Sequence, residues 1–335
     1  MRRVQSSNGR YMTGIKTMIR VTDKDTQYDE KAKRLLGNKY ILAYLLVKTV
    51  DEFRGMDPKE VVSYIEGEPF ISTVPVEPGI TNVVQTKEGE QIIGLNGEYG
   101  EINEGLIRFD IVFYVRIPSV GRIKDEVSQI IVNVEAQKDM PGSYDILNRA
   151  IFYVCRLVSS QKERDFAHSN YNDIKRVFSI WICMNTKENS MEYVHLTREK
   201  WLGNTGWKGN LNLLNIVLIG LSKKLPKADP KYELHRLLGT LFSKELSAEE
   251  KLNIMEAEYK IPLEDSIKEE VAMMCNLSQG IKEDGIEIGK EIGKEIGEAK
   301  IIISLYKNGF TEEQIAKVAE KKVDEIRTIL EKNIN

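Results

Sequence analysis

The chain has few of the residues that form disulfide bonds in small secreted proteins or that bind zinc. It contains three cysteines and three histidines among 335 residues. Cys155, Cys183 and Cys275 lie far apart in the sequence and two of them sit in strongly apolar periodic segments, so we expect reduced core residues rather than a disulfide framework. The histidines show none of the spacings typical of a zinc site. Any bound metal is therefore expected to have oxygen ligands, as Mg²⁺ or Mn²⁺ does.

Long apolar runs are also missing. The longest stretch, LNLLNIVLIGL at 211–221, is about half a membrane span, and its two asparagines favour a buried strand or short helix. The first residues, MRRVQSSNGRYMTG, are basic and polar without an apolar core, which argues against a secretory signal. We therefore expect no membrane segment, a disordered segment at 1–22 and a cytoplasmic protein.

An excess of one charge is absent as well. The formal net charge is −3, so binding to DNA would need a local basic cleft rather than a broadly basic surface. With 41% hydrophobic and 30% charged residues, the chain can bury one sizeable α/β core with smaller appendages.

The coarse element pattern alternates helices and strands. Residues 31–53 predict one long amphipathic helix ahead of a sheet, and Asp57 followed by Pro58 predicts the start of another. The buried run FSIWICMN at 178–185 predicts a central strand, in which Trp181, like Trp201 further along, is expected to serve packing.

Two strand-like segments carry carboxylates where a strand should be apolar. In EGLIRFDIVFYVR (104–116), alternation places Asp110 on the face opposite the apolar row. In VSQIIVNVEAQK (127–138), Glu135 and Gln137 share one face in the same way. The two segments together predict an antiparallel pair with polar groups gathered on one side.

The register of that pair decides how close the carboxylates come. If residues 117–126 close a hairpin, symmetric pairing sets Asp110 across from Asn133 and diagonal to Glu135. Two carboxylates so placed can share one hard cation. The alternative is an ordinary solvated sheet face, which also carries Asp, Glu, Asn and Gln.

A helix is predicted directly after these two strands. MPG at 140–142 breaks the second strand, and residues 143–160 predict a helix whose apolar stripe packs inward. Arg149, Tyr153 and Arg156 lie on a neighbouring stripe. An arginine near a carboxylate–metal site can clamp a phosphate bidentately. For Arg149 a surface position is an equal alternative, and for Arg156 it is the favoured one.

In order along the chain, several segments resemble the PD-(D/E)XK nuclease superfamily, in the branch of PD-(D/E)XK nuclease family transposases close to the Rpn recombination-promoting nucleases. They are YDEKAKRLLGNKYILAYLL (28–46), RFDIVFY (108–114), IVNVEAQKDMPG (131–142), RAIFYVCRLVSSQ (149–161), FSIWICMN (178–185) and the glycine-repeat tail. The resemblance implies a restriction-endonuclease-like mixed sheet core of order αβββαβ, followed by an all-helical C-terminal tail.

The resemblance also implies site residues. Asp110 and Glu135 occupy the positions of the metal ligands, and Gln137 occupies the position of the superfamily lysine, as it does in the Rpn-like branch. A lysine there places positive charge beside the attacking water, whereas a glutamine amide can orient water but carries no charge. The implied cofactor is Mg²⁺ or Mn²⁺, and the implied partner is DNA.

The C-terminal part predicts helices throughout. Ser247 and Glu250 form a capping-box pattern, and glycine recurs every fourth residue in 280–300, a spacing that lets helices approach closely. Residues 301–335 predict three short helices resembling a helix-turn-helix, with Gly309 as a helix stop and Thr311 and Gln314 as a capping box. Ten basic against twelve acidic residues in 281–335 favour packing or homo-oligomerisation through 280–335 over DNA reading.

Together these observations predict a metal-dependent deoxyribonuclease, an endonuclease of mobile-element or recombination type. The alternatives are an inactive nuclease-fold protein that binds DNA or another partner, and a nuclease effector in phage defence. The expected organisation is a disordered N-terminus (1–22), a nuclease-like domain (23–225), a helical extension (226–279), a glycine-repeat helix (280–300) and a helix-turn-helix-like module (301–335).

Overall fold

The structure is a computed structural model that describes most of the chain. The described residues are 23–24, 26–71, 98–99, 107–108, 110–118, 128–162, 164–166, 168, 170–203 and 206–334, so the predicted disordered segment 1–22 lies outside them. The chain divides into two compact units, one of residues 29–275 and one that includes 276–335. Across the described ranges, no helix combines the length and apolarity needed to cross a membrane.

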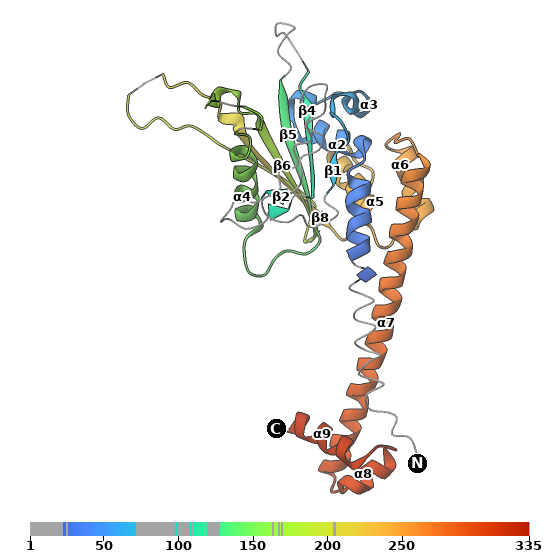
Figure 1. Cartoon of the computed structure of the whole chain (residues 1–335). Helices are drawn as coiled ribbons and strands as arrows, with labels where there is room; N and C mark the ends of the chain where they lie inside the picture. The colour runs from blue at the N-terminus through green and yellow to red at the C-terminus, as the bar shows by residue number, and fades with distance from the viewer. Residues whose placement is uncertain are drawn as a thin grey trace, which may run out of the picture. The chain divides into compact units, whose positions relative to one another are not determined.

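The larger unit is an α/β structure built on a six-stranded mixed sheet of order β1-β4-β5-β6-β8-β7 (Figure 1). Its strands are β1 (Phe70–Ile71), β4 (Ile111–Arg116), β5 (Gln129–Gln137), β6 (Arg176–Thr186), β7 (Ser190–His195) and β8 (Leu214–Ser222). The inner strands β5, β6 and β8 are parallel, and the outer pairings are antiparallel. The predicted central position of 178–185 is confirmed, because β6 lies between β5 and β8.

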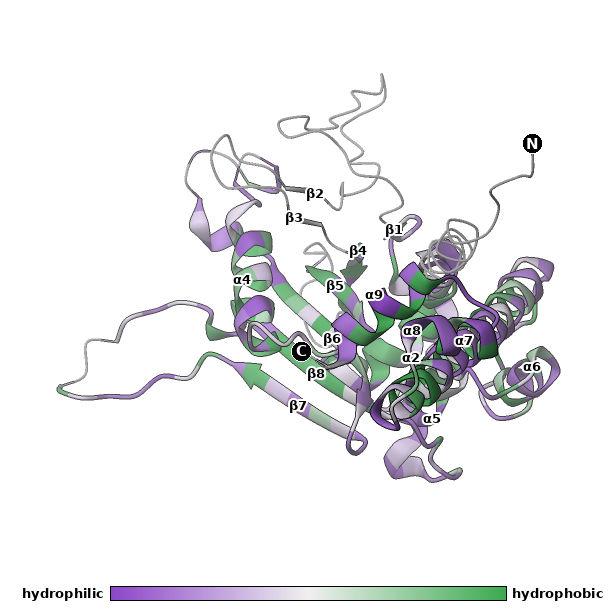
Figure 2. Cartoon of the chain, turned by 90° about the horizontal axis from the view of Figure 1, so that it is seen from below, coloured by the Kyte–Doolittle hydropathy of each residue, from purple (hydrophilic) through white to green (hydrophobic). Residues whose placement is uncertain are grey.

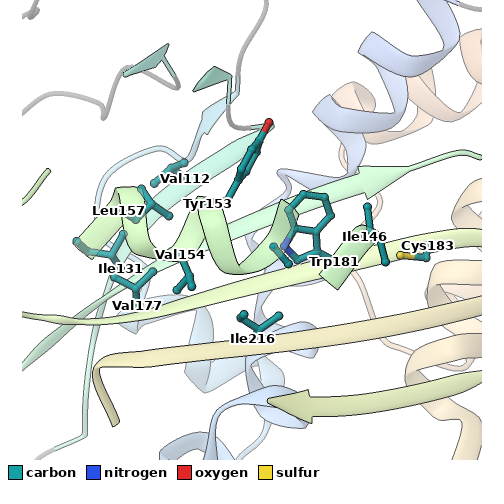
Figure 3. Close-up of a cluster of buried hydrophobic side chains, with 11 residues drawn as sticks. Val112, Ile131, Ile146, Tyr153, Val154, Leu157, Val177, Trp181, Cys183 and Ile216 are labelled. Atoms are coloured by element: carbon teal, nitrogen blue, oxygen red, sulfur yellow. The ribbon is translucent and has the colours of Figure 1, made fainter. Parts of the chain in front are cut away.

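Helices cover both faces of this sheet. Figure 1 and Figure 2 show α4 (Ile146–Ser159) on one side and α2 (Lys39–Thr49) with α5 (Glu233–Phe242) on the other. The predicted inward stripe of the 143–160 helix is confirmed in the buried cluster beneath α4 (Figure 3), which consists of Val112, Ile131, Ile146, Ala150, Tyr153, Val154, Leu157, Val177, Trp181, Cys183 and Ile216.

Three predictions about single side chains are wrong. Cys183 is buried, but Cys155 is exposed and Cys275 is partly exposed, so the cysteines are free thiols in different environments. Trp181 is fully buried, whereas 91% of Trp201 is exposed. Arg156 is buried rather than at the surface, because it follows Tyr153 by three residues and shares its inward side of α4.

The predicted single helix at 31–53 is two helices. Residues 26–36 are helical, and α2 begins at Lys39 after a break at Gly37 and Asn38. The Asn38 side chain accepts a hydrogen bond from the Tyr40 N–H at 3.0 Å. Asparagine at an N-cap satisfies an otherwise unpaired amide, and glycine is a poor helix former, so the break follows from local chemistry.

Further along, η1 (Asp51–Phe53), α3 (Pro58–Val61) and η2 (Val62–Tyr64) precede the sheet. The predicted N-cap of α3 is confirmed by a hydrogen bond from the Lys59 N–H to Asp57 at 2.9 Å.

The pairing of β4 with β5 differs from the predicted register by two residues. Val112, not Asp110, lies opposite Asn133, and the ladder extends until the Ile117 N–H donates to the Ser128 carbonyl. A shift by two leaves every side chain on its predicted face, so the alternation pattern cannot distinguish the two registers.

The predicted strand 104–116 is also divided. It contains β3 (Ile107–Arg108), which pairs with β2 (Glu98–Tyr99) in a separate two-stranded sheet, and then β4, with Asp110 in a bend before Ile111.

In the helical part of the chain, the helices of the structure do not begin and end at the predicted domain boundaries. α5 and α6 (Ala248–Ala257) belong to the larger unit, and η3 (Tyr171–Asp173), η4 (Leu211–Leu213) and η5 (Pro230–Tyr232) are short 3₁₀ turns within it. A single 43-residue helix, α7 (Asp265–Lys307), runs through the predicted boundaries at 279 and 300. The capping box of Ser247 and Glu250 is confirmed.

The smaller unit contains the end of α7, α8 (Glu312–Val318) and α9 (Val323–Ile334). Its apolar core consists of Ile302, Ile315, Ala316, Ile326 and Leu330. The predicted helix stop at Gly309 is confirmed by its left-handed backbone, with φ of 88°. The capping box of Thr311 and Gln314 is confirmed too.

Candidate active site

The two predicted acidic residues lie side by side at the junction of β4 and β5. The Asp110 N–H donates to Glu135 Oε1 at 3.1 Å, and the Ala136 N–H donates to Asp110 Oδ2 at 2.9 Å. Each carboxylate thus binds a backbone amide of the other segment at the place where regular strand pairing stops. The structure therefore brings Asp110 and Glu135 together, directly across from each other rather than diagonally.

Glu135 is almost completely enclosed, with 3% of its surface exposed. Burial and the neighbouring charge of Asp110 raise the pKa of Glu135 well above its usual range. The amide of Asp110, the charge of Arg149 and a hydrogen bond from Asn133 oppose this rise without cancelling it. Two carboxylates this close favour a shared proton or a shared cation between them.

A lysine from the start of the chain reaches the same place. Lys33, on the helical segment 26–36, places its Nζ 2.6 Å from Asp110 Oδ1. Burial lowers the pKa of Lys33, but the charges of Asp110 and Glu135 outweigh burial and leave that pKa raised. Sequence reasoning missed Lys33, whose only signal is its position next to the buried Ala32 on an amphipathic segment.

Gln137 and Arg149 meet beside the carboxylates. The Gln137 amide donates to the Asp139 carbonyl at 2.6 Å and accepts from Arg149 at 3.3 Å. Arg149 also donates to the hydroxyls of Tyr144 at 3.1 Å and Tyr153 at 2.9 Å. The nitrogen and the oxygen of the Gln137 side-chain amide are therefore both hydrogen-bonded, and the oxygen binds Arg149.

Two aromatic rings lie against the guanidinium of Arg149. Its Cζ lies 4.9 Å from the centre of the Tyr153 ring and 5.3 Å from that of Trp181. Trp181 is anchored in turn by a hydrogen bond of 2.9 Å to Ser179. Burial lowers the pKa of Arg149, but its contacts with Tyr153 and Tyr144 leave it raised. Arg149 is thus a half-buried, ordered cation beside the acidic pair.

The donor set can be compared with the needs of a metal ion. In the described part of the chain, no group of three or more His, Cys, Asp and Glu side chains could hold a metal. Mg²⁺ needs fewer protein ligands, because it is commonly held by one or two carboxylates together with waters and phosphate oxygens. A carboxylate oxygen has two lone pairs, so each Asp110 oxygen that accepts one hydrogen bond keeps one for a metal. The carboxylate oxygens of Asp110 and Glu135 are donors of the kind that Mg²⁺ and Mn²⁺ accept.

The larger unit also has hollows in its surface. Two cavities of about 530 Å³ each are lined by other residues, one around Glu52, Arg176 and Tyr193 and one around Asn189 and Ser222.

Comparison with known proteins found no matching family model, no matching curated protein and no matching solved structure.

Proposed function

We propose that the chain is a Mg²⁺- or Mn²⁺-dependent DNA endonuclease of recombination or mobile-element type, with a PD-(D/E)XK-like core. The observation that carries the proposal is the pair of Asp110 and Glu135, in which Glu135 accepts from the Asp110 N–H, Asp110 accepts from the Ala136 N–H, and the cations Lys33 and Arg149 flank both. With the short helix α3 and the separate β2–β3 pair left aside, the order of α2, β1, β4, β5, α4 and β6 supports the αβββαβ arrangement implied by the sequence resemblance.

The chain's own groups have separate parts in this proposal. Asp110 and Glu135 would hold the ion, which when bound activates a water molecule and stabilises charge on the phosphate. Arg149 hydrogen-bonds neutral groups, so its charge is available to a phosphate oxygen. Gln137 holds Arg149 in place and is the group that would orient the attacking water.

Nicking of supercoiled plasmid with and without Mg²⁺ or Mn²⁺ tests the proposal. We expect nicking that needs the metal and stops in Asp110→Ala and Glu135→Ala, because one remaining carboxylate holds a weakly bound octahedral cation poorly. Asp173→Ala, which removes an exposed carboxylate elsewhere, is the matched control. Undiminished nicking by folded Asp110→Ala protein would remove this site assignment.

A second candidate is a nuclease-fold protein that binds DNA or another partner without cutting it. It is favoured by the neutral Gln137, whose amide is engaged at both ends. A mobility shift of DNA at metal concentrations that give no nicking would support it. A nuclease effector in phage defence would share the chemistry of the leading proposal and differ in biological role.

A further inference from the structure

Positive charge at the acidic pair comes from the helical segment 26–36 and not from the position of the superfamily lysine. Gln137, at the position of the superfamily lysine, is neutral. The ammonium of Lys33 instead lies 2.6 Å from Asp110 Oδ1, with 27% of its side chain exposed. A lysine is therefore present at the site, but it enters from the helical segment 26–36.

The backbone that carries Lys33 is held firmly. Ala32, Leu35 and Leu36 of the same segment are buried, with at most 4% of their surface exposed. Lysine has a flexible four-carbon stem and three donors. Its ammonium can therefore turn from a carboxylate oxygen to a nearby phosphate oxygen while its backbone stays fixed.

We propose that Lys33 supplies the positive charge that Gln137 lacks and acts as a catalytic residue of the site. Its ammonium holds Asp110 in the free protein and contacts the scissile phosphate when DNA and the metal ion are bound. This inference rests on the proposed nuclease function. It also has a consequence without DNA, because the ammonium and a metal ion use the same Asp110 oxygen.

Lys33→Met separates these two consequences. Its nicking rate should fall by about 10²–10³-fold, the usual loss for one transition-state donor. Its affinity for Mn²⁺, measured by calorimetry without DNA, should rise by about tenfold, because one positive charge a few Å from the ion is gone. Lys33→Arg keeps the charge and should retain part of the nicking rate.

Two further variants show whether charge is the cause. Lys33→Met combined with Gln137→Lys returns a lysine to the superfamily position and should nick at least about tenfold faster than Lys33→Met alone. Lys31→Met is the matched control, because it removes a neighbouring lysine and its pair with Glu270 without touching Asp110. It should leave nicking and Mn²⁺ affinity unchanged.

The outcomes are distinguishable. Slow nicking by Lys33→Met without recovery in the double variant would show a merely structural lysine and overturn the inference. Mn²⁺ affinity equal in Lys33→Met and Lys31→Met would overturn the placement of Lys33 at the metal, whatever the nicking result. Failure of wild-type protein to nick DNA overturns the nuclease function and the catalytic role together, and the calorimetry then decides only whether Lys33 competes with metal.

Discussion

At the scale of single residues, Asp165 is a firmly held carboxylate that lies away from the candidate site. The Asp165 side chain is 2% exposed and contacts Arg164 at 2.7 Å and Lys175 at 2.8 Å. The Tyr114 hydroxyl donates to it at 2.7 Å. Burial raises the pKa of Asp165, but these partners outweigh burial and leave that pKa below its usual range. Asp165 is therefore a structural charge that joins the sheet to the turn after α4.

The lowered pKa of Asp165 predicts an acid dependence of stability. A carboxylate with a folded-state pKa below its unfolded value stabilises the fold above the unfolded pKa, and this contribution is lost as the pH falls through the folded pKa. Asp165→Asn should thus lower the free energy of unfolding by about 3 kcal/mol at pH 7 and by less at pH 3. Urea titrations at both pH values measure this, with the exposed Asp173→Asn as control. An equal loss at pH 7 and pH 3 would contradict the assignment.

At the scale of elements, the break between the helical segment 26–36 and α2 positions the candidate site. It separates the segment that carries Lys33 from the helix that covers the sheet. Both signals of the break, Gly37 and the N-cap Asn38, are present in the sequence, but an apolar pattern that continues across them conceals it. Hydrophobic periodicity reports which face is buried and is a weaker guide to where a helix stops.

Asn38→Ala tests this boundary. Losing the cap should lower the free energy of unfolding by about 1 kcal/mol, because the Tyr40 amide then has no side-chain acceptor. Asn148→Ala, at an exposed position inside α4, is the control and should be neutral or slightly stabilising, since alanine favours helix interiors. Thermal unfolding followed by circular dichroism measures both. Equal effects of the two changes would show that Asn38 does not cap α2.

At the scale of the whole molecule, the repeated glycines of α7 form a stripe on the helix surface that no other described part of the chain covers. A Cβ added at Gly285, Gly289, Gly293 or Gly297 would meet no described atom within 4 Å. Ile286, Ile292 and Ile296 are also exposed, at 51%, 46% and 51%. Glycines that each cost roughly 0.8–1.0 kcal/mol of helix propensity are best explained by a partner helix that approaches closely. We propose that residues 280–335 mediate self-association.

Truncation after Gln279 tests the assembly. We expect a dimer or larger oligomer for the full chain and a monomer for the truncated one, by light scattering at micromolar concentration, with metal binding and weak nicking retained. Gly289→Leu combined with Gly293→Leu in the full chain should also weaken association, because bulky side chains prevent close helix approach. A monomeric full-length protein would refute self-association through this region.

Local periodicity in the sequence determines much of the site and the layers around it. Alternation with a period of two places Asp110, Glu135 and Gln137 on one side of the sheet, and the 3.6-residue period identifies the buried face of α4. The buried run of β6 and the capping boxes of α6 and α8 are equally local signals. These features are predictable because each depends on residues close together in the chain.

The tertiary structure decides those features that local sequence patterns leave ambiguous or do not indicate at all. A two-residue shift between β4 and β5 changes no side-chain face, so only the folded pairing sets Asp110 directly across from Glu135. The burial of Arg156 depends on how α4 lies against the sheet. No local sequence pattern indicates the role of Lys33. Its ammonium reaches Asp110 only because long-range packing brings the segment 26–36 to the sheet.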